Sequence, residues 1–122
     1  MGAPKIRSAT RIVAERVRAS TTIRRSRRAL LDGQAVTFRG KLRGGWIPYQ
    51  GKLVEVQFHA RGKWRTFATT RTDRTGRWAY RYRFTGTHGT IRYRFRARIP
   101  RETGYPYVTG RSHRVRVTVR GR

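Results

Sequence analysis

The chain has 122 residues, and its 31 Lys and Arg against five Asp and Glu give a formal net charge of +26. This length suits one domain with a single core. Cysteine is absent, which excludes disulfides and thiolate metal sites, and no apolar run is long enough for a transmembrane helix. Aromatic residues make up 11% of the chain and can anchor a core, because each buried ring removes a large area from water.

The first 19 residues form a basic N-terminal segment that we expect to be partly flexible and poorly ordered. One domain is predicted from residue 20 to residue 122. The β-favouring residues of Arg18–Ile23 fit a first edge strand. The basic segment Arg24–Asp32 lacks a regular pattern and is predicted as a loop that leads into the next strand.

From residue 35 onward, apolar and polar residues alternate with a period of two, which is typical of strands with one buried face. Five runs show it: 36–42, 54–58, 78–84, 93–99 and 115–119. A less regular strand is predicted over Trp64–Thr72. The pattern predicts an all-β antiparallel sandwich of about seven strands, in which the last strand pairs beside the strand over 93–99.

Turn residues separate these strands. Ala60–Lys63 is predicted as a hairpin turn, and the segment Thr72–Gly76 as a second turn. In the second turn we expect the Asp73 side chain to accept hydrogen bonds from backbone amides, and Gly76 to take a positive φ.

Two stretches resemble bacterial Ig-like domains and carboxypeptidase-regulatory-like sandwiches: Gly51–Gln57 with the following Gly62-Lys63-Trp64, and the TDxxG turn of Thr72–Trp78. The stretch Phe95–Tyr107 resembles C-terminal Ig-like modules of secreted actinobacterial proteins. The resemblance covers residues 20–122 and implies an Ig-like fold. It also implies an accessory, spacer or adhesion role outside the cell.

Catalytic groups are scarce. We expect Asp73 to serve its turn and Glu55 to form a surface ion pair with a neighbouring arginine. The histidines His59, His88 and His113 are far apart and lack the spacing of metal ligands. We therefore predict a protein that is not an enzyme and that uses no cofactor or metal.

The alternation predicts two rows of outward-facing arginine. The first combines residues 92–98 with the last strand. The second combines Arg39, Lys41 and Arg43 with Arg81 and Arg83 on the opposite sheet. The candidate polyanion-binding residues are Arg92, Arg94, Arg96, Arg98, Arg114 and Arg116 in the first row and Arg81 and Arg83 in the second. Two interpretations stay open: a phosphate-rich partner, since arginine binds phosphate in a bidentate manner, or the arginine-rich composition of a GC-rich genome.

Two long loops carry aromatic residues that can stack on sugars or bases: Trp46, Tyr49, Tyr105 and Tyr107. The alternative is that these loops fold back to cover the ends of the core. Trp64 and Trp78, which flank the Asp73 turn, are both predicted in the core.

The leading hypothesis is a non-catalytic Ig-like accessory module of an exported or cell-surface protein. Such a module would be a spacer, or would bind anionic polymers of the cell envelope. No export signal is visible in the first 20 residues, so a cytoplasmic protein that binds nucleic acid without sequence preference is the alternative.

Overall fold

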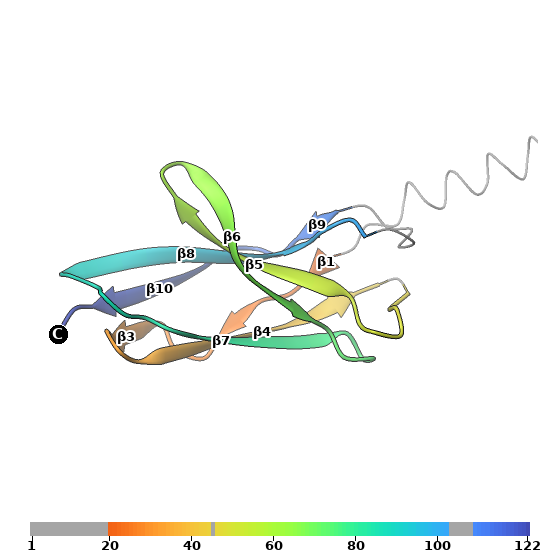
Figure 1. Cartoon of the computed structure of the whole chain (residues 1–122), viewed down its shortest axis with the longest axis horizontal. Helices are drawn as coiled ribbons and strands as arrows, with labels where there is room; N and C mark the ends of the chain where they lie inside the picture. Colours follow the sequence, from red (N-terminus) through yellow and green to blue (C-terminus); the bar gives the residue numbers. More distant parts are fainter. Residues whose placement is uncertain (1–19, 45, 103–108) are drawn as a thin grey trace, which may run out of the picture.

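A computed structural model describes residues 20–44, 46–102 and 109–122, which form an all-β sandwich of two sheets (Figure 1). The predicted N-terminal segment 1–19 lies outside the described residues. Six of the strands have six residues or more, and four have two or three. The strands are β1 (Ser20–Thr21), β2 (Arg24–Arg25), β3 (Ala29–Leu31), β4 (Ala35–Arg43), β5 (Leu53–Ala60), β6 (Lys63–Arg71), β7 (Arg77–Arg83), β8 (Thr90–Ile99), β9 (Gly110–Arg111) and β10 (Val115–Arg120).

The first sheet is built around β4. On one side β4 pairs with β7, and on the other side β1 and β2 follow one continuous antiparallel register along it, with Ser20 opposite Arg43 and Arg24 opposite Arg39. Between the two short strands, the Lys41 amide donates to the Thr22 hydroxyl at 3.0 Å. Of the first edge strand predicted over Arg18–Ile23, Ser20–Thr21 is confirmed as β1, and residues 18 and 19 lie outside the described residues.

The second sheet has the order β3-β10-β8-β5-β6, with β9 beside the end of β8. The predicted pairing of the last strand with the strand over 93–99 is confirmed by the β10–β8 register. The predicted loop over 24–32 is wrong, because β2 pairs with β4 and β3 pairs in parallel with β10. Both short strands form by long-range backbone pairing, and Leu30 of β3 is buried in the core.

The core lies between the inward faces of the two sheets. Every predicted period-two run places its apolar residues there, and the rings of Phe38 and Phe95 meet across the sheets at 4.7 Å between centroids. In β6, the register shift opposite Val56 and Gln57 leaves Phe67 without a direct strand partner. The Phe67 ring packs against Phe95 at 5.8 Å. This bulge explains the irregular pattern of the sixth strand.

Gly40 lets Trp78 pack against the middle of β4. The two residues are directly opposed, and a Cβ at Gly40 would collide with the Trp78 ring and with the Thr22 carbonyl. The Trp78 indole N–H donates to the Thr21 hydroxyl at 2.9 Å, so that its polar edge is satisfied while the ring is buried. The prediction of Trp78 in the core is confirmed.

Both predicted turns are confirmed. Arg61 and Gly62 have φ of 52° and 75° in the β5–β6 hairpin. Asp73 Oδ1 accepts the Thr75 amide at 2.8 Å and the Arg77 amide at 3.0 Å, and Gly76 has a φ of 87°.

A buried lysine ties the start of β5 to the end of β8. Lys52 has a fully buried side chain, and its Nζ donates to Glu102 Oε1 at 2.9 Å and to the Pro100 carbonyl at 2.7 Å. The same carboxylate oxygen accepts the Leu53 amide at 2.9 Å, and Arg71 lies 3.5 Å from its other oxygen. Glu102 thereby joins three segments of the second sheet.

We predict that Glu102→Gln lowers the free energy of unfolding by about 3 kcal/mol, because a buried ammonium loses its anionic contact. The matched control is Glu55→Gln, which removes a pair with Arg98, whose side chain is 36% exposed, and should cost no more than about 1 kcal/mol. Urea unfolding of both variants measures the two losses, and equal losses would contradict the account.

The pH dependence gives a second readout for the same variant. Burial acts to raise the pKa of Glu102, but the hydrogen bonds from Lys52 and Leu53 and the charges of Lys52 and Arg71 outweigh it and hold the pKa below the ordinary 4.5. The stabilisation is therefore present above the unfolded-state pKa and is lost as the pH falls through the lowered folded-state pKa. The Glu102→Gln protein should lose less stability on acidification than the unaltered protein.

Candidate functional site

The described residues include four of the five acidic side chains, and each has structural partners. Asp32 accepts the Thr87 amide at 3.1 Å, Asp73 holds its turn, and Glu102 binds Lys52. Glu55 alone pairs with a member of the predicted arginine rows, with 2.6 Å between its Oε1 and an Arg98 Nη. Within the described part of the chain, ion pairs engage only three cations: Lys52, Arg71 and Arg98.

Seven arginines project from the outer side of the second sheet, and we call this surface the arginine face. The inward positions of β8 are Phe95, Ala97 and Ile99, so the alternate residues point outward. The face consists of Arg92, Arg94, Arg96 and Arg98 of β8, Arg111 of β9, and Arg116 and Arg120 of β10.

Like charges oppose each other directly across the strands of the arginine face. Arg94 is in register with Arg116, and Arg98 is in register with Arg111. Such opposed pairs are destabilising in a sheet by up to about 1 kcal/mol each. Arg114, the remaining residue predicted for this row, directly precedes β10 and is exposed.

The arginine face has a fixed end and an open end. Arg96 Nε donates to Gln57 Oε1 at 2.8 Å, and the guanidinium lies 4.3 Å from the centre of the Trp64 ring. Partial burial lowers the pKa of Arg96, and the nearby charges of Arg111 and Arg98 lower it further. Arg92, Arg94 and Arg116 are exposed, so the open end can reach a partner.

The prediction of Trp64 in the core is wrong. The ring is half-buried on the outer side of the second sheet, where it packs against His59 at 5.2 Å and beneath Arg96. Trp64 is in register with His59, whose outward phase was visible in the alternation of β5. The bulge at Phe67 changes the phase between Trp64 and Ala68, which is in register with the inward Val56, and that change hid the outward position of Trp64.

The second predicted row lies on the outer side of the first sheet. Arg81 and Arg83 of β7 stand opposite Thr37 and Ala35. They are therefore displaced along the sheet from the cations at the other end of β4.

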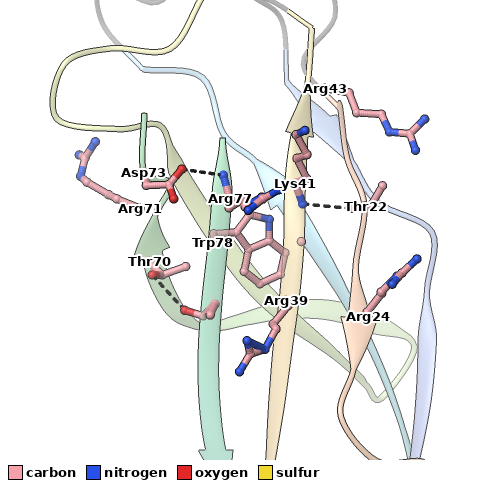
Figure 2. Close-up of a pocket in the computed structure, with 12 residues that line it drawn as sticks. Thr22, Arg24, Arg39, Lys41, Arg43, Thr70, Arg71, Asp73, Arg77 and Trp78 are labelled. Carbon is pink, nitrogen blue, oxygen red and sulfur yellow. Dashed lines mark hydrogen bonds between the residues drawn. The ribbon is translucent and has the colours of Figure 1, made fainter. Parts of the chain in front are cut away.

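The predicted second row also includes Arg39, Lys41 and Arg43 of β4, and in the structure cations of neighbouring strands join them. In this group Lys41 faces Arg77, and Arg39 faces Arg24 on its other side. Around them lies a depression of about 670 Å³, which we call the basic hollow (Figure 2). Its cationic lining is Arg24, Arg39, Lys41, Arg43, Arg71 and Arg77. The alternation of β4 indicated that its cations point outward. The sequence did not indicate that Arg24 and Arg77 lie on strands that pair with β4.

The first aromatic loop exposes two rings. Trp46 is 56% exposed and Tyr49 is 82% exposed, and the Arg74 guanidinium lies 4.7 Å from the centre of the Tyr49 ring. Ile47 packs against the core and Pro48 is buried, so these two residues cover the end of the sandwich. The predicted Tyr105 and Tyr107 lie outside the described residues.

Over the described ranges, no three His, Asp or Glu side chains gather in a group that could hold a metal ion. The described residues form strands and no helix, so none of them forms a helix that could span a membrane. The His59 ring contacts the ring of Trp64. The chemistry that these surfaces offer is the binding of anions by guanidinium groups.

Comparison with known proteins gives no assignment, since no protein-family model and no curated protein matches the chain.

We predict that Arg94→Gln raises the free energy of unfolding at low salt by up to about 1 kcal/mol, because it relieves the repulsion from Arg116. Added salt should shrink this gain, because it screens exposed charges. The control is Arg65→Gln, an exposed arginine of β6 opposite Phe58, which should change stability by less than about 0.5 kcal/mol. Thermal unfolding across a salt series measures both, and a gain that persists at high salt would contradict the repulsion.

Proposed function

We propose that the chain is a non-catalytic Ig-like accessory module of an exported or cell-surface protein. Its arginine face binds anionic polymers of the cell envelope, and its rigid sandwich holds that face at a fixed distance from the rest of the protein. The proposal assigns the open end of the face, Arg92, Arg94 and Arg116, to polymer contact. Arg114 extends this end beyond β10.

The strand pairing supports the Ig-like assignment. In immunoglobulin-type sandwiches strands B and E lie in one sheet and strands C, F and G in the other. Here β4 pairs with β7 in the first sheet, and β5, β8 and β10 lie side by side in the second. β6 extends the second sheet beside β5, as strand C′ does in variable-type domains.

The direct opposition of Arg94 and Arg116 is the observation that carries the binding proposal. The sheet brings these cations together although the described carboxylates are committed elsewhere. A bound phosphate would accept hydrogen bonds from both guanidinium groups and would remove their repulsion. Anion binding thus converts an unfavourable contact of the free protein into a favourable one.

The arginine face favours a polymer over a single small anion. Outward arginines recur at every second residue of β8, so successive charges can meet successive charges of an extended chain. Binding of this kind depends on charge and not on sequence, and it weakens steeply as salt rises because counterions are released.

Nucleic acid is the second candidate. The exposed Trp46 and Tyr49 rings favour it, because aromatic side chains stack on unpaired bases. A single-stranded ligand that contacts these rings would bind more tightly than a duplex of equal charge, and it would lose that advantage on removal of the rings.

We predict that poly(glycerol phosphate) binds the protein with an affinity that falls steeply with salt, and that Arg92→Glu, Arg94→Glu and Arg116→Glu together abolish the binding. The matched control reverses three cations of the opposite sheet, Arg39, Arg81 and Arg83, with the same change in net charge. Fluorescence anisotropy with labelled polymer measures both.

Equal losses in the two triple variants would show that net charge alone governs binding, and would contradict the arginine face. Duplex DNA and single-stranded RNA serve as comparison ligands. Tighter binding of single-stranded RNA that is lost with Trp46→Ala and Tyr49→Ala would favour nucleic acid over the envelope polymer.

A further inference from the structure

The basic hollow lies mainly on the first sheet, whereas the arginine face lies on the second, and the two differ in shape. Its six cations come from four strands: Arg24 of β2, Arg39, Lys41 and Arg43 of β4, Arg77 of β7, and Arg71 of β6, which belongs to the second sheet. They surround the edge of Trp78 (Figure 2). The hollow is therefore a concave site, whereas the arginine face follows the strands.

Small residues keep the middle of the hollow open. On the outer side of β7, Ala79 stands opposite Arg39, between the outward positions of Arg77 and Arg81. Gly40 has no side chain, and the buried Trp78 ring packs against it. The long cationic side chains therefore surround a surface that is formed by the backbone and by the edge of the Trp78 indole. A volume of about 670 Å³ is within the range of pockets for small ligands.

The charges of the hollow have little internal compensation. Of its six cations, Arg71 is the one that forms an ion pair within the described residues, with Glu102. The hollow contains one carboxylate, Asp73, which accepts hydrogen bonds from the Thr75 hydroxyl at 2.7 Å and from the Arg77 amide at 3.0 Å. The hydrogen bond from the Thr75 hydroxyl is the main reason why the pKa of Asp73 lies below its ordinary 3.8, and the hydrogen bond from the Arg77 amide lowers it further. Asp73 is therefore anionic at neutral pH and disfavours phosphate on its own side of the hollow.

We propose that the basic hollow binds a small ligand that carries two or more adjacent phosphoryl groups. Arg24, Arg39 and Lys41 contact these groups on the side away from Asp73. Adjacent phosphoryl groups match the site because they concentrate several negative charges and many acceptor oxygens within the reach of cations from different strands. A single orthophosphate would reach fewer of the cations and would bind more weakly.

This site is independent of polymer binding by the arginine face, and the two can fail separately. Inorganic tripolyphosphate is the probe, with titration calorimetry in about 150 mM NaCl, where weak exposed attraction is screened. We expect one tripolyphosphate per chain and a clearly weaker signal for orthophosphate at the same concentrations.

The decisive comparison uses two double variants with the same loss of charge. Arg39→Gln with Lys41→Gln should weaken tripolyphosphate binding at least about tenfold, since it removes two charge-assisted contacts. Arg81→Gln with Arg83→Gln, on the same sheet but displaced along it from the hollow, should weaken it less than about twofold. If the first variant does not fold, Arg24→Gln with Arg77→Gln tests the same hollow from the neighbouring strands.

Three outcomes would overturn the proposal. The first is an equal loss in the hollow variant and in the Arg81→Gln, Arg83→Gln control, which would mean attraction by net charge. The second is orthophosphate binding as tight as that of tripolyphosphate. The third is the lack of saturable binding at this salt concentration. None of these results depends on whether poly(glycerol phosphate) binds the arginine face.

Discussion

Repulsion among arginines is the constraint to which this fold responds. A net charge of +26 on 122 residues has to be carried by two sheet surfaces. The described carboxylates neutralise only two arginines of those surfaces, Arg98 through Glu55 and Arg71 through Glu102. Asp32, Asp73 and Glu102 accept hydrogen bonds from backbone amides, and Glu102 also binds a buried lysine. The few anionic groups therefore hold the chain in its shape, and the outer surfaces keep most of their positive charge.

The core compensates for this repulsion with rings and β-branched residues. Ring contacts of Phe38 with Phe95 and of Phe67 with Tyr82 connect the two sheets. Val36, Val54 and Val117 are buried in the same core. Lys52 and Glu102 close the sandwich where β5 begins and β8 ends. A rigid interior of this kind can hold like charges close together, because each backbone pairing fixes the strands whatever their outward residues are.

The alternation along the chain predicted the long strands and the inward residues, since the period of two reports directly which side of a strand is buried. It also predicted the turn at Asp73. It did not predict β3, whose pairing with β10 joins residues nearly 90 positions apart. It misplaced Trp64 because the β6 bulge changes the phase within one strand.

The same distinction applies to the binding surfaces. The arginine row of β8 was visible in the sequence, because all its members lie on one strand. Of the basic hollow, the cations of β4 were visible in the sequence. The addition of Arg24, Arg71 and Arg77 was not, because tertiary pairing decides which strands are neighbours. The opposition of Arg94 and Arg116 needed the exact register, which alternation alone does not fix.

The central claim is that specific arginines, and not the net charge as a whole, meet the anionic partner. The most direct measurement is NMR observation of the arginine Nε–Hε groups during titration with poly(glycerol phosphate). The account predicts early and saturating shifts for Arg92, Arg94 and Arg116, with small changes at Arg65 and Arg74. Shifts of equal size at arginines over the whole surface would contradict it.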